Sequence, residues 1–278
     1  MATKTSESFA KTSTSANVPL NFTSRPTLIA YITCGDPDLA TTQQIALAAI
    51  KAGAEILELG VPFSDPVADG PVIQRASQRA LEHGTKLADV LDLARDLRKQ
   101  HSETGLVIFT YLNPMLRFGL ERFADAARQA RLDGALITDL TVEEARDYLR
   151  IMRSRGLATI FLAAPTSTDE RLRRIAAAST GFIYAVSRTG VTGERNELPE
   201  DARALVRRVR KFTKLPIAVG FGISSGQQVA AVAEYAEGAV VGSAIVRCIE
   251  EAPQGEAPRR VAELIRKLKG AERSATRA

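Results

Sequence analysis

The chain of 278 residues has no tryptophan, two cysteines and two histidines. Cys34 and Cys248 lie far apart and form no metal-binding or redox spacing, so we expect reduced thiols in a cytoplasmic protein. His83 and His101 stand in polar helical surroundings, and neither is placed as a metal ligand or a catalytic base. Because no cluster of histidines and carboxylates is present, we expect no metal site.

Long apolar runs are missing as well. No stretch approaches the roughly 20 consecutive apolar residues of a membrane helix, and the start, MATKTSESFAKTSTSANVP, lacks the apolar core of a secretory signal. That start also has no arginine and no amphipathic face, which argues against a transit peptide. We expect no membrane partner, a disordered extension over residues 1–25, a catalytic domain over residues 26–270 and a flexible tail over residues 271–278.

The net charge of +5 is modest, and the basic residues are spread over helix faces with acids nearby. No stacking aromatic residues are interleaved with them. Such a pattern is typical of solvated helix faces, so we expect no nucleic-acid partner.

Eight short runs rich in β-formers recur along the chain, each mostly apolar, as in parallel strands covered on both faces. They are Thr27–Thr33, Glu55–Gly60, Leu106–Leu112, Gly134–Leu140, Ala158–Ala164, Gly181–Ser187, Pro216–Gly222 and Gly238–Ser243. With helical segments between them, they predict an α/β fold with a single (β/α)8 (TIM) barrel. A doubly wound open sheet is the alternative, weakened by the absence of a glycine-rich dinucleotide turn after the first run.

Segments with helical periodicity separate the strands, and two connections are longer than the rest. The expected helices include Ala40–Ala52, Leu87–Gln100, Val142–Arg155 and Pro199–Phe212, and Glu143 and Glu144 are expected in a first helical turn. The connection after the second strand has room for a loop and an extra helix near Val72–Leu81. The long loop after the sixth strand, SRTGVTGERNELPE, has the composition of a mobile lid.

The segment from Ile56 to Gly70 places one acid on an apolar strand and two more in the loop that follows. Glu58 would be costly to desolvate, so its presence needs a reason. At the carboxyl end of a barrel strand that reason is usually catalysis, with a buried ion pair as the alternative. Asp69 stands before Gly70, where an Asx-turn is the alternative to a catalytic role, and Asp65 has the same alternative.

Two glycine-bearing turns follow the last two strands. Gly220–Ser225 and Gly242-Ser243 each open a helix, the second of them the last helix of the chain. In (β/α)8 enzymes these two loops commonly hold a phosphate, because glycines allow close approach and helix N-terminal amides donate to the anion. Gly222, Gly242 and Ser243, with Gly193 from the lid, are the expected cradle. The alternative is that the glycines only make tight turns.

Several motifs together resemble the tryptophan synthase alpha subunit family over roughly residues 26–266. They are TCGDPD from Thr33, LELGVPFSDPVADGPVIQ from Leu57, YLNPM from Tyr111, FLAAPTS from Phe161, YAVSRTGVTG from Tyr184, GFGISS and GSAIV. The resemblance implies cleavage of indole-3-glycerol phosphate to indole and glyceraldehyde 3-phosphate with no cofactor in this chain. It also implies a beta-subunit partner that carries pyridoxal phosphate (PLP), in an α2β2 tetramer.

The resemblance further assigns roles to individual residues. Glu58 would donate a proton to indole C3, and Asp69 would stabilise the positive charge that develops on the ring nitrogen. Thr192 would close the lid over Asp69, Arg188 would serve the lid, and Asp65 would lie in a docking loop. The aromatic slot for the indole would be lined by Tyr31, Phe109, Tyr111, Ile160, Tyr184 and Phe221. Each of these could instead be ordinary core, and for Ile160 both interpretations are equally favoured.

Thr141 departs from the family pattern, which often has proline at this position near the expected subunit interface. Three other functions stay open: a stand-alone indole-releasing lyase, a binding subunit without activity, and a different isomerase or aldolase acting on a sugar phosphate. The retained pair Glu58 and Asp69 argues against a binding subunit. A Schiff-base aldolase would need a lysine at a strand end, and none of the eight strands ends in one.

Overall fold

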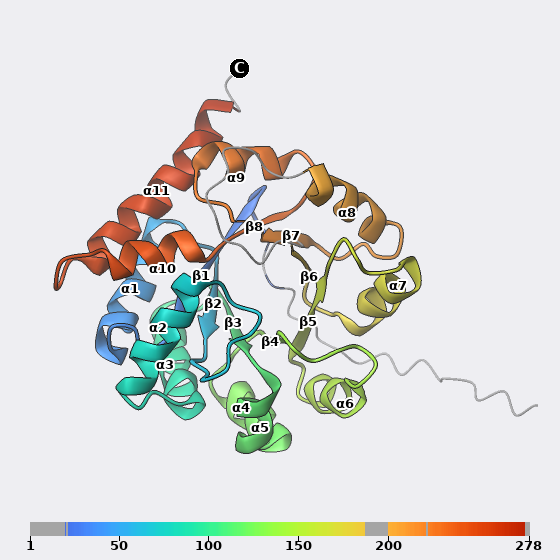
Figure 1. The fold of residues 1–278 in the computed structure, drawn as a ribbon, viewed down its shortest axis with the longest axis horizontal. Helices are drawn as coiled ribbons and strands as arrows, with labels where there is room; N and C mark the ends of the chain where they lie inside the picture. Colours follow the sequence, from blue (N-terminus) through green and yellow to red (C-terminus); the bar gives the residue numbers. More distant parts are fainter. Residues whose placement is uncertain (1–19, 21, 187–199, 221, 276–278) are drawn as a thin grey trace, which may run out of the picture.

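Eight parallel strands close into a barrel in the order β1 to β8 (Figure 1), in a computed structural model that describes residues 20, 22–186, 200–220 and 222–275. The strands are β1 (Thr27–Thr33), β2 (Ile56–Gly60), β3 (Gly105–Thr110), β4 (Gly134–Ile137), β5 (Ala158–Ala163), β6 (Ile183–Val186), β7 (Ile217–Gly220) and β8 (Gly238–Val241). All eight expected strands are confirmed, and the open-sheet alternative is wrong because β8 pairs with β1.

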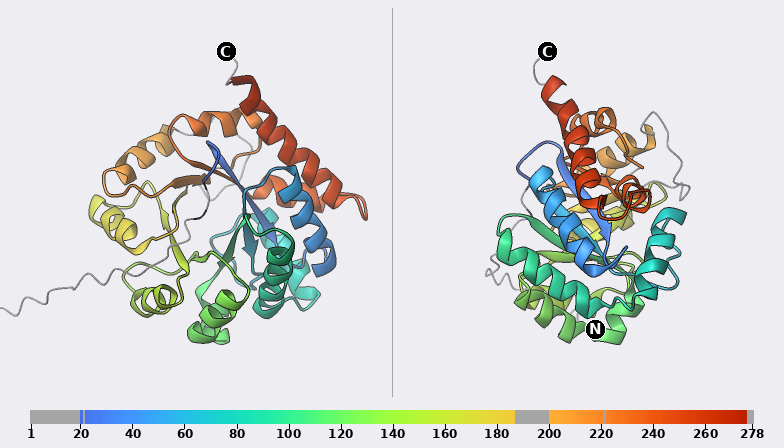
Figure 2. Two further views of the ribbon diagram at one scale, coloured as in Figure 1. Left: turned by 180° about the vertical axis from the view of Figure 1, so that it is seen from behind. Right: turned by 90° about the vertical axis from the view of Figure 1, so that its left-hand side faces the viewer.

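Helices form a ring around the barrel in all three views (Figures 1 and 2). They are α1 (Leu39–Ala52), α2 (Pro71–Glu82), α3 (Leu87–Gln100), α4 (Leu112–Phe118), α5 (Leu120–Gln129), α6 (Arg146–Ser154), α7 (Asp169–Ala178), α8 (Glu200–Arg210), α9 (Gly226–Ala233), α10 (Ser243–Glu250) and α11 (Ala257–Ala275). The expected extra helix after the second strand is confirmed as α2.

Three details differ from the sequence-based expectation. Helix α6 begins at Arg146, so Glu143 and Glu144 lie before its first turn. The cause is a local turn, in which the Glu144 amide donates to the Thr141 carbonyl and the Thr141 hydroxyl donates to the Glu144 carboxylate. Strand β3 ends two residues early, because the Leu112 amide donates to Asp139 Oδ1 and Leu112 begins α4. The helix after β8, α10, is followed by a further helix, α11.

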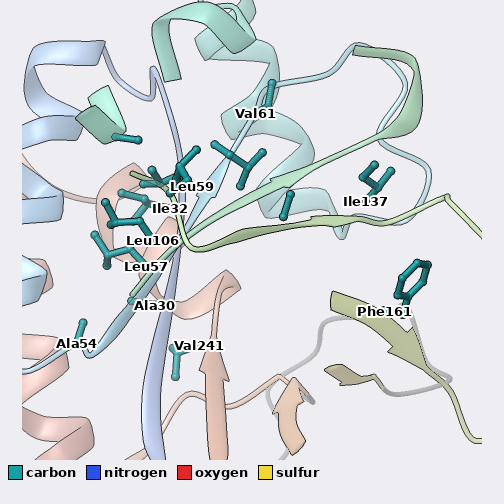
Figure 3. Packing of buried hydrophobic residues seen from close by; sticks show 14 of the residues in the cluster. Ala30, Ile32, Ala54, Leu57, Leu59, Val61, Leu106, Ile137, Phe161 and Val241 are labelled. Atoms are coloured by element: carbon teal, nitrogen blue, oxygen red, sulfur yellow. The ribbon is translucent and has the colours of Figure 1, made fainter. Parts of the chain in front are cut away.

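Alternation along each strand divides the core into two layers. Outward-facing residues such as Ala30, Leu57 and Leu59 pack under the helices in one large cluster (Figure 3). Inward-facing residues such as Ile29 and Ile56 form a second cluster inside the barrel. Because side chains along a strand alternate between faces, Glu58 shares the inward face with Ile56.

The amino end of the barrel is closed by the segment that precedes β1. Leu20 is buried and Phe22 packs beside it, with the Phe22 ring 5.7 Å from that of Phe182. A Cβ added to Gly105 or Gly181 would come within 3.1 Å of the Leu20 side chain, so glycine leaves room for it. Leu20 and Phe22 of the expected extension therefore pack against the barrel.

Candidate active site

Glu58 lies in the middle of β2, fully buried, and its position inside the barrel follows from the strand alternation. Neither of its carboxylate oxygens has a hydrogen-bond partner among the described residues. Burial without a partner disfavours the charged form, which raises the pKa of Glu58 to about 8. No lysine or arginine in the described ranges forms an ion pair with Glu58, so the ion-pair alternative finds no support. Its acid form is therefore favoured at neutral pH.

Asp69 closes the loop between β2 and α2 and is half-buried. Its Oδ2 accepts a hydrogen bond of 3.0 Å from the Tyr111 hydroxyl, which in turn accepts one of 3.0 Å from the Ala68 amide. Desolvation raises the pKa of Asp69 to about 6, and the bond from Tyr111 opposes that rise. Asp69 thus stays ionised at neutral pH, and Tyr111, rather than an Asx-turn, orients its carboxylate.

Tyrosine rings from opposite sides of the barrel face the two acids. Tyr31 of β1 is directly in register with Glu58, and its ring centroid lies 5.1 Å from that of Phe109 of β3. Burial is the main cause that raises the pKa values of Tyr31 and Tyr184, and the negative charges of Glu58 and Asp69 add to it. Both phenols are therefore neutral and able to donate a hydrogen bond. Aromatic side chains thus lie around one protonated and one ionised carboxyl group, at the position of the expected aromatic slot.

The sequence also raised expectations for Ile160 and Asp65. Ile160 belongs to the inner barrel cluster with Leu20, against which Phe109 and Tyr184 also pack, so both interpretations of Ile160 stay open. Asp65 is exposed and accepts from the Ser64 hydroxyl at 2.5 Å, next to Val67, whose side chain is 84% exposed. The loop around Asp65 therefore faces outward, away from the two acids.

The two expected phosphate turns differ in how their helices begin. Helix α9 is capped by its own residues, because the Ser225 hydroxyl accepts from the Gln228 amide in a capping box. Helix α10 begins after Gly242 with no side-chain cap. Gly242 lies against the Cβ of Tyr31, so the open end of α10 adjoins the aromatic slot. Among the described residues no side chain caps the start of α10, which leaves this helix end open to an anion.

Thr192, Gly193, Phe221 and Arg188 lie outside the described residues. Gly222 is described and adopts a φ of +70°, a backbone conformation that favours glycine. Among the residues that the structure describes, no group of three or more metal-ligating side chains occurs. No helix in the same part of the chain is long and apolar enough to cross a membrane.

A cluster of charged side chains beside the slot was missed by the sequence analysis. Arg79 of α2 binds Asp36 in the loop after β1 through two hydrogen bonds of 2.8 and 2.9 Å, and it binds Glu250 of α10 at 2.9 Å. Asp36 falls within the TCGDPD motif at the carboxyl end of a strand, which was a signal. Arg79, which lies 43 residues further along the chain, carries no sequence signal that would pair it with Asp36.

Fold and site together define the class: a (β/α)8-barrel enzyme with one buried and one half-buried acid and an open helix end at the carboxyl face of its strands. The family model described as "Tryptophan synthase alpha chain" matches residues 19–275. The chain therefore belongs to the tryptophan synthase alpha chain family, and it is a lyase of tryptophan synthesis.

Individual relatives are similar to this chain over most of their length. The tryptophan synthase alpha chain of Solibacter usitatus is 54% identical over 227 residues, 82% of this chain and 85% of the relative. A tryptophan synthase complex from Pyrococcus furiosus contains a chain with a TM-score of 0.82 at 40% identity, covering 88% of this chain and 98% of that one. A structure of tryptophan synthase from Mycobacterium tuberculosis gives a TM-score of 0.83 at 38% identity, covering 90% and 93%.

Proposed function

We propose that this chain cleaves indole-3-glycerol phosphate to indole and glyceraldehyde 3-phosphate in a retro-aldol reaction. The observation that carries the proposal is the pair of acids: Glu58 is buried without a partner, and Asp69 is held by Tyr111. The first is an acid at neutral pH and the second an anion. This reaction needs one of each.

In the proposed reaction Glu58 first gives a proton to the substrate and then takes one from it. The Glu58 carboxyl group delivers its proton to indole C3, which becomes tetrahedral, and positive charge develops on the ring nitrogen. The Asp69 carboxylate stabilises that charge through the indole N–H. The Glu58 carboxylate then takes the proton of the glycerol hydroxyl as its C=O forms, and the electron pair of the breaking C–C bond returns to the ring.

The remaining groups bind the substrate. Tyr31, Phe109 and Tyr184 would hold the indole ring, and Gly242 and Ser243 at the open end of α10 would hold the phosphate. Gly222 would bring the loop after β7 to the same phosphate. Gly193 and Phe221 complete this proposal, with Thr192 as the residue that closes over Asp69.

The partner in this proposal is a tryptophan synthase beta subunit in an α2β2 tetramer. PLP belongs to that subunit, where indole would be converted to L-tryptophan, and this chain would use no cofactor of its own. Two free thiols, Cys34 and Cys248, support a cytoplasmic location.

The test is turnover of indole-3-glycerol phosphate by the purified chain, with and without a beta subunit, following glyceraldehyde 3-phosphate with a coupled dehydrogenase. Weak activity that rises strongly with the partner is expected. Fast turnover by the isolated chain would instead favour a stand-alone lyase. Absence of turnover in both conditions, from a folded protein, would overturn the proposal.

Two substitutions test the assigned roles. Glu58→Gln is expected to abolish cleavage and Asp69→Asn to lower it severely, both with folding intact by circular dichroism. Near wild-type turnover in Glu58→Gln would exclude the proton-transfer steps described above.

A further inference from the structure

Helix α2 connects the Asp69 loop to the phosphate end of the site. It begins at Pro71, two residues after Asp69. Its buried residues Val72 and Ala76 form one cluster with Tyr31 of the slot and Val246 of α10. A shift of α2 would therefore move Asp69, which precedes its amino end, and would change the packing against Tyr31 along its length.

Arg79, near the carboxyl end of α2, fixes the helix to two separate elements. Nε and Nη2 bind the two oxygens of Asp36, which is only 3% exposed, and Nη1 binds Glu250, the last residue of α10. A planar guanidinium with this fork geometry restrains direction as well as distance. Three segments meet at one side chain: the loop after β1, the helix that follows Asp69, and the helix whose open end adjoins the slot.

Arg75, one turn earlier on α2, makes a natural comparison. It also binds Glu250 through two hydrogen bonds, of 2.8 and 2.7 Å, but it does not contact Asp36. Its side chain is 52% exposed, so its ion pair is screened by water and contributes little. Arg75 joins α2 to α10 alone, whereas Arg79 also joins α2 to the barrel through a buried carboxylate.

We propose that Arg79 is a positioning residue that holds the Asp69 carboxylate at a fixed place relative to the open end of α10, so that the charge-stabilising group and the phosphate anchor act on one substrate molecule. This inference rests on the proposed function. Arg79 contacts neither the substrate slot nor Asp69, so it acts through α2. Loss of its restraint displaces Asp69 while Glu58, fixed inside strand β2, stays in place.

A double-mutant cycle tests whether Arg79 acts through Asp69. Arg79→Gln is expected to lower kcat for indole-3-glycerol phosphate about 10- to 100-fold with a much smaller change in KM, since a shift of about 1 Å at a catalytic group can cost 100-fold. In the Asp69→Asn background the same substitution is expected to cost less than about threefold. An equal loss in both backgrounds would overturn the proposal, because it would mean that Arg79 acts independently of Asp69.

Two matched variants complete the design. Arg75→Gln removes one of the two partners of Glu250 on α2 and is expected to change kcat less than about twofold. Arg79→Lys keeps the charge but cannot bind Asp36 and Glu250 in the same fork, so an intermediate loss is expected. If Arg79→Gln fails to fold, the cycle with Arg79→Lys decides. A loss in Arg75→Gln equal to that in Arg79→Gln would reduce the role of Arg79 to general support of α2.

Amide hydrogen exchange provides a readout that needs no catalysis. The Ala68 amide is protected by Tyr111 and the Asp69 amide by the Pro66 carbonyl. Both are expected to exchange faster in Arg79→Gln than in wild type or Arg75→Gln, with exchange of strand β2 unchanged. If the wild-type chain does not cleave indole-3-glycerol phosphate, the proposed function falls, and this measurement alone decides whether Arg79 positions the loop. Unchanged exchange at both amides would refute it.

Discussion

Glu58 and Asp69 are both acids weakened by burial, but their surroundings separate their pKa values. Glu58 has no hydrogen-bond partner among the described residues, whereas Asp69 accepts one from Tyr111. Burial raises the pKa of Glu58 to about 8 and that of Asp69 to about 6, the latter in spite of the bond from Tyr111. In the interval between these values, one group keeps its proton and the other has lost it, as the two proposed roles require.

A bell-shaped dependence of kcat/KM on pH follows from this separation. Activity is expected to rise as pH increases through about 6, where Asp69 ionises, and to fall as pH increases through about 8, where Glu58 loses its proton. Steady-state kinetics of indole-3-glycerol phosphate cleavage between pH 5 and pH 9 would measure both limbs.

The substitution Tyr111→Phe tests whether Asp69 is the group that titrates in the acidic limb of that profile. Loss of the hydroxyl removes a hydrogen bond to the ionised form of Asp69, so the acidic limb is expected to move to higher pH. The basic limb, assigned to Glu58, should stay where it is. An acidic limb that does not move would mean that a group other than Asp69 titrates there.

Stability should show the cost of keeping Glu58 inside the barrel. Its folded-state pKa, about 8, lies above the ordinary value of 4.5, so the unfolded chain ionises first and the folded state loses stability as pH rises from 4.5 to 8. Glu58→Gln has no such group. The free energy of unfolding of this variant minus that of wild type is expected to grow by about 1.4 kcal/mol per pH unit between pH 5 and pH 7. Urea unfolding at several pH values measures it, and a flat difference would contradict burial as the cause.

At the level of secondary structure, the barrel repeats one hydrogen bond four times at its amino end. An amide at the start of each odd-numbered strand donates to a side chain just before the next strand. The four pairs are Leu28 to Glu55, Leu106 to Asp133, Thr159 to Thr180 and Ile217 to Glu237, at 2.7, 2.7, 3.0 and 2.9 Å. Each bond closes one β-α-β unit, so the barrel is built from four units joined in the same way.

Asp133 carries the largest expected contribution to stability in this set. Besides the Leu106 amide, it binds Arg98, whose side chain is only 6% exposed. Asp133→Asn leaves that buried guanidinium without a counter-charge, which is expected to lower the free energy of unfolding by about 3 kcal/mol in a denaturant titration. Asp96→Asn removes an exposed pair with Lys99 and should leave the midpoint unchanged. Equal effects of the two substitutions would show that burial of Arg98 is unimportant.

Strand positions were predictable because each strand is a short apolar run, and the closed order followed from their number. The placement of Glu58 inside the barrel was predictable from alternation along β2. Contacts that depend on long-range packing were not, and Arg79 with Asp36 is the clearest case. Local hydrogen bonds that compete with regular structure were not predictable either. The turn closed by Thr141 makes α6 begin later, and the bond from the Leu112 amide to Asp139 ends β3 earlier.

For the molecule as a whole, we expect a partner subunit to cover the face on which two exposed apolar side chains lie. Val67 is 84% exposed in the loop after β2, and Leu116 is 54% exposed on α4 after β3. Both follow the carboxyl ends of neighbouring strands. In the proposed complex, this is the side on which indole would leave the slot, and burial of these side chains would contribute to association.

Val67→Asp and Leu116→Asp are each expected to weaken activation by the beta subunit about tenfold or more, while turnover by the isolated chain is retained. Leu81→Asp is the control, since Leu81 is also a large exposed apolar residue, at 37%, and lies at the end of α2 remote from Asp69. Titrating the beta subunit against a fixed amount of each variant gives the apparent affinity. A loss with Leu81→Asp as large as with the other two would place the interface elsewhere.

The closure of the barrel by Leu20 and Phe22 has a practical consequence. Both side chains sit among glycines at the amino ends of strands, opposite the end that carries Asp69 and the open end of α10. A tether attached ahead of Leu20 would therefore fix the protein to a bead or electrode by its inert side, leaving substrate and partner free access from solution. Deleting the chain through Phe22 to shorten that tether would expose the inner core at the amino end of the barrel.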